Sequence, residues 1–459
     1  MHFIARILVI YCTLLALPCF AKDISKEETN ATPTNFLVLS DIHFDPFLAC
    51  QDVTPCPTIQ KLQEAPVSAW PALLTKDTTV AYGKDTSYTL LTSSLSAASQ
   101  AAKDKRIAFV VVLGDFLAHD YREKYVYFAH DKTAAGYRRF VRKTLSFLDS
   151  EMQKYFQKIS IYGALGNNDS YVRDYGIDAK GAFFKDVSEL WSVLIQDPAA
   201  RLQMKQTFSK RGYYSVLLKN PESLRVVFLN SSFFSSKAKG KFVPEGAKEQ
   251  LVWLRSELEA AKAKNEHVLI CMHIPMGIDV YSSLHGVSFS LVEFWMPAYA
   301  KSFKALLETY AAEIVGVLAG HLHADWFQAL RFRGVEIPVI GTPAISPVYH
   351  NNPGFKIYTY SNQSKKLEDF ETYYYPIKEN KNWMVEYIFS WIYGTDCKNC
   401  SIGDTIAQLR ATGRLSEFYQ KSYMVSTGSE QLQAYWYPYY WCAIFKESSE
   451  DYQKCVGKR

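Results

Sequence analysis

The stretch FLVLSDIH, residues 36–43, carries the pattern that decides the fold. Four apolar residues, typical of a buried strand, are followed at once by Asp41 and His43, two side chains that can bind a metal. The same pattern, a short apolar run that ends at a metal-capable side chain, recurs four times along the chain. The later copies end in Gly114-Asp115, Gly166-Asn167-Asn168-Asp169, Met272-His273 and Gly320-His321-Leu322-His323.

Between these signatures, apolar runs alternate with longer segments of helical periodicity. This alternation predicts an α/β layered fold. Because ligands of open α/β sheets bind beyond the carboxyl ends of the strands, we expect the five signatures to meet in one crevice. The pattern predicts strands at 36–39, 107–113, 159–162, 268–272 and 314–318, and helices at 246–263 and 301–310.

The donor types point to a metal centre. Each signature alone has an ordinary explanation, since an aspartate often caps a helix and a single histidine is often just buried. However, one of the ten histidines lies in an N-terminal segment that we expect to be removed, and four of the other nine fall within the signatures. Carboxylate, amide oxygen and imidazole together suit Zn²⁺, Mn²⁺ or Fe better than Ca²⁺. The predicted ligands are Asp41, His43, Asp115, Asn167, His273, His321 and His323.

The ordered set of signatures resembles the calcineurin-like metallophosphoesterases, and more narrowly their acid sphingomyelinase-like phosphodiesterase branch. The narrower resemblance rests on GDFLAHD at 114–120, NPGF at 352–355 and the pair Cys442 and Cys455. It implies a layered β-sandwich flanked by helices, and two divalent ions that share the bridging Asp115. One ion would be held by Asp41, His43, Asp115 and His323, and the other by Asp115, Asn167, His273 and His321.

A charge count supports phosphodiester hydrolysis. Two divalent ions bring four positive charges, and Asp41, Asp115 and a bridging hydroxide bring three negative charges, which leaves one positive charge for a phosphodiester monoanion. The resemblance implies attack by that hydroxide, and it places a proton donor for the leaving oxygen at His119. An unperturbed imidazole titrates near ~6.5, which suits this role. The alternative for His119 is an exposed loop histidine.

One position departs from the family pattern. The family usually has histidine where this chain has Asn168, which can donate a hydrogen bond to a phosphoryl oxygen but cannot supply a proton. We therefore expect Asn168 to belong to the catalytic set at some cost in rate or with a changed leaving-group preference. A hypothesis from another class is a binding protein that retains metal but has lost turnover.

The expected substrates are nucleotides or other small soluble phosphodiesters and phosphoanhydrides. Acid sphingomyelinases carry a lipid-binding saposin domain before the catalytic domain, and only about twenty residues separate the expected cleavage point from Asp41, too few for such a domain. The alternative is a sphingomyelin phosphodiesterase that releases phosphocholine, with the Tyr- and Trp-rich C-terminal region in place of the missing domain.

The N-terminus predicts export. Arg6 precedes an apolar run at 7–20, and Cys19 and Ala21 put small residues at the two cleavage-site positions. We therefore expect a signal peptide at 1–21 and a polar, disordered leader at 22–34. A retained membrane anchor is the alternative, but the run is shorter than the ~20 residues that a spanning helix needs. Secreted, periplasmic and lysosome-like compartments all remain open.

Cysteine spacing agrees with an oxidising compartment. Seven cysteines follow the expected signal peptide, and close spacing suggests three disulfides, although six cysteines allow 15 connectivities. Cys271 is left over in an apolar run, where we expect it to be buried. We expect a catalytic domain at 35–372 and a small helical domain with cysteines at 373–459. The suggested pairs are Cys50–Cys56, Cys397–Cys400 and Cys442–Cys455.

Composition excludes some partners. The formal net charge is +5, and no run of Lys or Arg forms a basic stripe, so we expect no sequence-specific binding of nucleic acid. Attachment to a membrane surface is not predicted, and we expect a monomer.

Overall fold

The computed structural model describes residues 32–285, 290–379, 381–394, 397, 400–412, 417–427, 435–446 and 448–457. The predicted signal peptide and most of the predicted leader lie outside these residues. Thr34, the last residue of the predicted leader, is the first residue of a strand. No helix in the described ranges is both long and apolar enough to cross a membrane.

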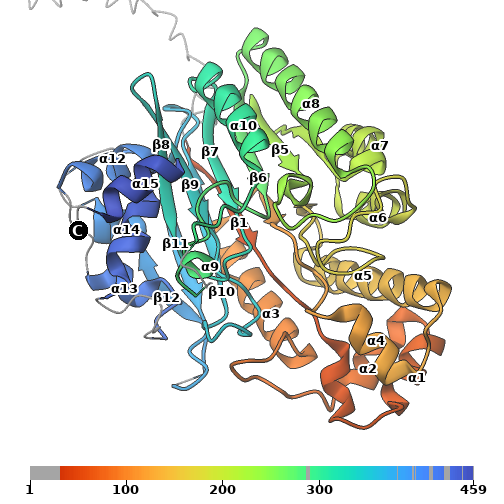
Figure 1. Cartoon of the computed structure of the whole chain (residues 1–459). Coiled ribbons are helices and arrows are strands. Elements are labelled where there is room, and N and C mark those ends of the chain that lie inside the picture. The colour runs from red at the N-terminus through yellow and green to blue at the C-terminus, as the bar shows by residue number, and fades with distance from the viewer. Residues whose placement is uncertain are drawn as a thin grey trace, which may run out of the picture.

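Two six-stranded mixed sheets form the centre of the molecule (Figure 1). In the first sheet the parallel strands β1, β2 and β3 lie beside the antiparallel strands β10, β11 and β12. Strands β1 and β2 are buried over nearly their whole length, which explains their continuous apolar sequences. In sheet order, the strands are β12 (Met384–Ile388), β11 (Leu367–Tyr374), β10 (Gly354–Tyr360), β1 (Thr34–Leu39), β2 (Phe109–Val112) and β3 (Ser160–Gly163).

The second sheet has parallel strands at its centre and an antiparallel strand at each edge. It packs against the first sheet: the ring of Tyr162 in β3 stacks on Phe228 in β5, with centroids 6.0 Å apart. The core therefore lies between the two sheets and beneath the helices that cover them. In sheet order, the strands are β4 (Tyr214–Leu217), β5 (Leu224–Leu229), β6 (His267–Met272), β7 (Ile314–Ala319), β9 (Val335–Gly341) and β8 (Phe327–Phe332).

Helices flank the two sheets, and those that follow β12 gather beside β8, β9 and β11 (Figure 1). Capping residues define where several helices begin. Ser87 accepts a hydrogen bond from the backbone N–H of Leu90 at the start of α3, and Asp197 caps α7, which begins with Pro198. The helices are α1 (Pro57–Glu64), α2 (Trp70–Leu74), α3 (Tyr88–Lys105), α4 (Tyr121–Ala129), α5 (Ala134–Phe156), α6 (Phe183–Trp191), α7 (Pro198–Arg211), α8 (Val243–Ala263), α9 (Val280–His285), α10 (Pro297–Thr309), α11 (Phe389–Tyr393), α12 (Ile402–Thr412), α13 (Glu417–Ser422), α14 (Tyr437–Phe445) and α15 (Ser449–Val456).

The predicted elements are confirmed. A strand lies in each of the five predicted ranges, and α8 and α10 cover the two predicted helices. The three suggested disulfides are present, and Cys271 is a buried, free cysteine in β6. The expected boundary at residues 372 and 373 falls inside the first sheet: β11 runs to Tyr374, and β12 pairs with it and extends the sheet to Ile388. The C-terminal region is thus helical only after the sheet is complete.

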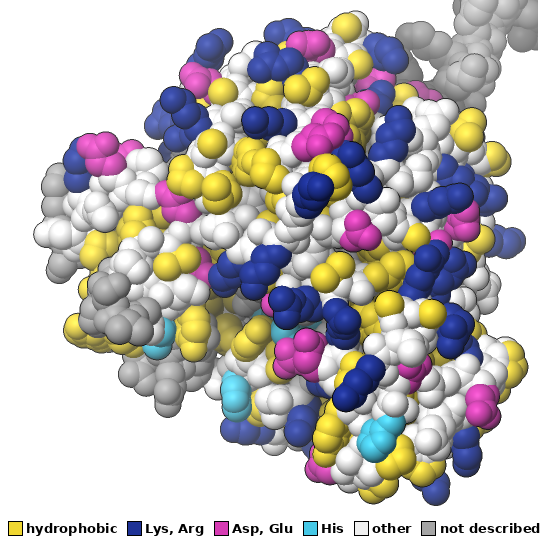
Figure 2. All heavy atoms as spheres, turned by 45° about the vertical axis from the view of Figure 1, so that its right-hand side comes forward, with side chains coloured by type: hydrophobic (Ala, Val, Ile, Leu, Met, Phe, Trp, Pro, Cys, Tyr) yellow, Lys and Arg dark blue, Asp and Glu magenta, His cyan; other side chains and the backbone are white. Residues whose placement is uncertain are grey.

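Figure 2 shows Lys and Arg side chains interspersed with Asp and Glu over one face of the molecule. This mixture agrees with the modest net charge of the chain.

Candidate metal centre and adjoining cavity

The predicted ligands follow five strand ends and lie together. Asp41 follows β1, Asp115 follows β2, Asn167 follows β3, His273 follows β6, and His321 and His323 follow β7. In the described part of the chain, Asp41, His43 and Asp115 form one group whose ligand atoms lie within 4.8 Å of one another, and Asp115, His273 and His321 form a second such group. Asp115 belongs to both.

Five of these residues have a left-handed backbone. The φ angles are 49° at Asp41, 43° at His43, 54° at Asp115, 73° at His321 and 55° at His323. Residues other than glycine rarely adopt this conformation, and such strain is typically stored at functional sites. The turns after the strands therefore aim these side chains at the crevice at a cost that the packed sheets must offset.

Two glycines make room for Asp115. Gly114 has φ +97°, where a side chain would be strained, and a Cβ there would lie 2.6 Å from the backbone N of Gly166. A Cβ at Gly166 would lie 2.0 Å from Asp115 Oδ1. Glycine before Asp115 and before Asn167 is thus needed for the two strand ends to approach.

The carboxylate of Asp115 lies between imidazoles from the two sheets. Its Oδ2 is 3.4 Å from His43 Nε2 and 3.1 Å from His273 Nε2. Asp41 Oδ1 lies 3.3 Å from His323 Nε2. Asp115 thus has the central position that a bridging ligand requires.

The hydrogen bonds of two imidazoles fix which ring nitrogen faces the crevice. His43 Nδ1 lies 2.9 Å from the carbonyl oxygen of Leu117, and His273 Nδ1 lies 2.7 Å from that of Leu113. Since a carbonyl only accepts, each Nδ1 donates, and in the neutral ring Nε2 is left without a proton.

Those Nε2 atoms face other acceptors. His43 Nε2 lies 3.1 Å from His323 Nε2, and His273 Nε2 lies 3.1 Å from Asn167 Oδ1. In the neutral rings these facing lone pairs repel one another unless a proton or a metal cation lies between them. Bonds from Nδ1 to backbone carbonyls are also how metal-binding histidines are commonly oriented, so the residues present fit divalent ions.

Asn167 is held in the orientation that a metal ligand needs. Its Nδ2 donates to Asp174 Oδ1 at 2.7 Å, which turns Oδ1 toward His273. The neighbouring Asn168 lies beside Asp115 and donates to its carboxylate. Both asparagines are nearly buried.

The electrostatics favour cations. Burial alone would lower the pKa of His43 and His273, but the Asp115 carboxylate, helped by Asp41, raises each pKa to about 9. In turn, although burial opposes it, the two histidines hold the pKa of Asp115 below its usual range. Burial, followed by the charge of His273, lowers the pKa of His321 to about 3, which favours the neutral ring.

His119 lies beside the candidate metal centre. Its ring stacks on His43 with centroids 4.0 Å apart, and its Nδ1 lies 2.9 Å from Asp85 Oδ1. Nδ1 donates to the carboxylate, so Nε2, which lies 3.2 Å from the hydroxyl of Tyr349, is the atom free to exchange a proton with a substrate. The side chain is 25% exposed and held on two sides. This geometry suits the proposed acid better than a loose loop histidine.

The sequence did not single out three supporting carboxylates. Asp169 accepts from the backbone N–H groups of Asp115, Phe116 and Gly166, each at 2.9 Å, and so shapes the turn that carries Asp115. The position of Asp169 in the signature at 166–169 could have indicated a role near the metal centre. Asp85 and Asp174 follow no strand, and local sequence gave no sign of them.

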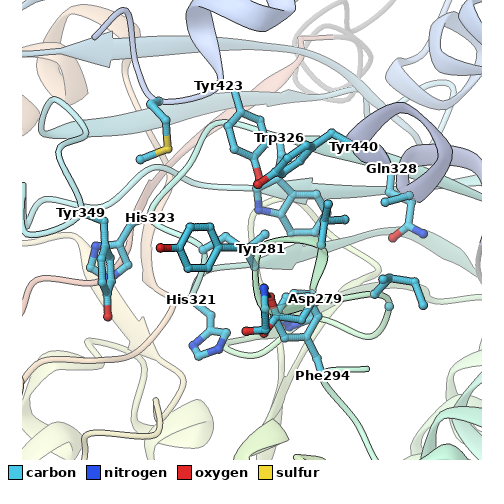
Figure 3. A pocket seen from close by; sticks show the side chains of 18 of the residues that line it. Asp279, Tyr281, Phe294, His321, His323, Trp326, Gln328, Tyr349, Tyr423 and Tyr440 are labelled. Atoms are coloured by element: carbon cyan, nitrogen blue, oxygen red, sulfur yellow. Dashed lines mark hydrogen bonds between the residues drawn. The ribbon is translucent and has the colours of Figure 1, made fainter. Parts of the chain in front are cut away.

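A cavity of about 520 Å³ adjoins the candidate metal centre. Asp115, Asn167, His321 and His323 line one end of it, with His119. Figure 3 shows the other end, where Trp326, Tyr423 and Tyr440 gather opposite His321 and His323. The size lies within the range of small-molecule sites.

Paired mixed sheets flanked by helices, with carboxylate, amide and imidazole groups at the strand ends, define a metallophosphoesterase fold. The family profile described as "Calcineurin-like phosphoesterase" matches residues 34–325, and the chain belongs to this family.

Similar proteins include phosphodiesterases. The chain is 30% identical to "Sphingomyelinase phosphodiesterase D" of Dictyostelium discoideum over 282 residues, which cover 57% of this chain and 60% of that protein. It is 25% identical to "Cyclic GMP-AMP phosphodiesterase SMPDL3A" of Rattus norvegicus, over 53% of this chain and 55% of that protein. The chain thus aligns to less than two thirds of either relative. Among solved structures, a dimetal phosphatase from Danio rerio has a TM-score of 0.42 at 12% identity, over 77% of this chain and 99% of that chain.

Proposed function

We propose that the protein is a phosphodiesterase with a binuclear metal centre. Asp41, His43, Asp115 and His323 would hold one divalent ion, and Asp115, Asn167, His273 and His321 the other. The observation that carries the proposal is the Asp115 carboxylate, which lies within 3.4 Å of His43 and 3.1 Å of His273 from opposite sheets. The mixed nitrogen and oxygen donors favour Zn²⁺.

Bound ions would supply Lewis acidity toward the phosphoryl oxygens and toward water. The chain's own part is positioning and proton transfer. His119 holds a proton on Nε2 while Asp85 fixes Nδ1, and it donates that proton to the leaving oxygen. Asn168 holds Asp115 in place through its side-chain amide.

We propose nucleotides and other small soluble phosphodiesters as substrates. The adjoining cavity supports this choice, since it is lined by aromatic rings together with polar groups such as Asp279 and Gln328. The rat relative is named for cyclic GMP-AMP, a cyclic dinucleotide. The second candidate is a sphingomyelin phosphodiesterase that releases phosphocholine, and the name of the Dictyostelium relative favours it.

The three disulfides support export to an oxidising compartment, which we propose as the place of action.

The test is a hydrolysis screen on zinc-loaded protein with metal analysis of the same sample. We expect about two ions per chain and cleavage of bis(p-nitrophenyl) phosphate and of nucleotide diesters. If the protein cleaves sphingomyelin vesicles faster than nucleotide diesters, without an added activator, the result would favour the second candidate. Loaded protein that binds a nucleotide but cleaves none of these substrates would contradict an enzymatic role.

A further inference from the structure

The far wall of the cavity comes from parts of the chain outside the family match at 34–325. Trp326 precedes β8, Tyr423 follows α13, and Tyr440 lies in α14. Tyr281 of α9 projects into the cavity between these rings and the histidines (Figure 3). The metal-capable residues and this aromatic wall therefore share one cavity but come from different regions of the sequence.

Hydrogen bonds fix the wall relative to the candidate metal centre. The backbone N–H of Asp325, two residues after His323, donates to the carbonyl of Tyr423 at 2.7 Å. Asn352 Nδ2 donates to the carbonyl of Val425 at 2.7 Å. The Cys442–Cys455 disulfide also joins α14 to α15. The rings are therefore held in place before any ligand binds.

Two of the rings that line the cavity are buried, and a third is half exposed. Tyr423 and Tyr440 are 5% and 6% exposed, and their rings meet edge-to-face with centroids 5.3 Å apart. Tyr281 is 50% exposed, and one face of its ring stacks on His285 at 4.3 Å. Because Tyr281 lines the cavity and His285 does not, the other face of Tyr281 is available to a bound ring.

We infer that this aromatic wall, together with Tyr281, is a subsite for a planar aromatic substituent of the phosphodiester. The substituent stacks on the ring of Tyr281, and Tyr423 and Tyr440 line the bottom of the subsite. The inference rests on the proposed function, and it assigns recognition of this substituent to Tyr281 of α9 together with Tyr423 and Tyr440 of the C-terminal region. Stacking on tyrosine is tolerant of ring type, so it selects a planar ring rather than one particular base.

Other substituents fit the wall less well. An acyl chain would cover the side-chain amide of Gln328, which lines the cavity, without offering it a hydrogen-bond partner. A quaternary ammonium group would contact tyrosines favourably, but it is compact and would leave most of the cavity of about 520 Å³ unfilled. A planar ring with polar edges uses both the faces and the polar groups.

The test compares two diesters with the same nitrophenolate leaving group: methyl p-nitrophenyl phosphate and thymidine 5′-(p-nitrophenyl phosphate). Tyr281→Ala in zinc-loaded full-length protein should lower kcat/KM for the thymidine ester by at least about fivefold more than for the methyl ester, mainly through KM. Tyr281→Phe keeps the ring and should retain most of the wild-type preference. Tyr127→Ala removes a similarly exposed tyrosine from α4, outside the cavity, and should leave the ratio between the two esters unchanged.

Equal losses on the two esters in Tyr281→Ala would overturn the subsite, as would a wild-type preference for p-nitrophenyl phosphocholine over the thymidine ester. In both cases the methyl ester would still be cleaved, and the proposed phosphodiesterase function would stand. If the wild type cleaves none of the three esters, the proposed function itself fails. Tyr281 is half exposed, so the alanine variant should fold, and its thermal unfolding curve checks this.

Discussion

Asn168 donates two hydrogen bonds to the carboxylate of Asp115. Its Nδ2 donates to Asp115 Oδ2 at 2.8 Å, and its backbone N–H donates to Oδ1 at 2.8 Å. The sequence suggested that Asn168 would contact a phosphoryl oxygen in place of the family histidine. In the structure one of its side-chain donors is already committed to the proposed bridging ligand, so we interpret Asn168 mainly as a residue that orients Asp115.

Replacing Asn168 by alanine should therefore weaken metal binding. Removal of a hydrogen-bond partner behind a ligand typically costs 10–100-fold in metal affinity or activity. We expect Asn168→Ala to lose zinc to a competing chelator at about tenfold lower chelator concentration than wild type. Unchanged zinc affinity together with a lower kcat would instead support direct contact with the substrate.

Asp115→Asn should remove both metal binding and activity. The substitution keeps the shape of the side chain but takes one negative charge from the point where the two ligand groups meet. Metal content measured on the purified variant should fall from two ions toward zero, with activity on bis(p-nitrophenyl) phosphate below about one thousandth of wild type. Two retained ions with full activity would rule out the bridging role.

His119→Ala should affect poor leaving groups most. Nitrophenolate departs without a proton, whereas an alkoxide needs one, so a missing acid slows only the second kind of ester strongly. We expect about a hundredfold loss of kcat on a nucleotide dialkyl diester, and less than about tenfold on nitrophenyl esters. His130→Ala, an exposed histidine after α4, serves as the control. Equal losses on both kinds of substrate would argue against proton donation by His119.

The strand ends could be predicted because they depend on local sequence. A short apolar run before Asp41, Asp115 or His273 reports burial directly, and the carboxyl ends of neighbouring parallel strands must meet. Close spacing of the cysteines likewise suggested the three disulfides that the structure contains. The ring nitrogens and their carbonyl partners could not be predicted, because contacts such as His273 with Leu113 join residues 160 positions apart.

The edge of the first sheet and the cavity wall depend on tertiary contacts. β12 has exposed Met384 and Val385 at its start, so its sequence gives no clear pattern of burial. Tyr423 and Tyr440 read only as part of a Tyr-rich region, and their place beside His321 follows from how the C-terminal helices pack on β8. The contact between Asp85 and His119 could not be predicted for the same reason, because the two residues lie 34 positions apart.

Lys356→Met should strongly destabilise the fold. Lys356 Nζ is buried and donates to both oxygens of Asp325 at 2.8 Å and to Thr372 at 2.7 Å. Removal of the lysine leaves a buried carboxylate unpaired, which typically costs about 3–5 kcal/mol. Lys366→Met breaks the exposed pair with Asp404 and should change the free energy of unfolding by less than about 1 kcal/mol. Urea denaturation compares the two, and similar small effects would show that the buried pair contributes little.

The pH dependence of stability should include a contribution from Glu386. Its Oε1 accepts from the hydroxyl of Ser426 at 2.6 Å, while Oε2 is buried with no partner in the described part of the chain. Burial, with the nearby charge of Asp325, raises the pKa of Glu386 to about 8. In the unfolded chain the pKa is about 4.3, so between these values the folded state holds a proton that the unfolded state has lost.

The free energy of unfolding should therefore fall as the pH rises through this window, by up to ~1.4 kcal/mol per pH unit from this group. Glu386→Gln is neutral at every pH. The gain in free energy of unfolding of this variant over wild type should therefore be absent near pH 4 and should grow toward pH 8. Urea denaturation of zinc-loaded protein at pH 5, 6.5 and 8 measures the difference, and Glu450→Gln at an exposed position of α15 is the control. Parallel stability curves for Glu386→Gln and wild type would mean that Glu386 is already ionised in the folded protein.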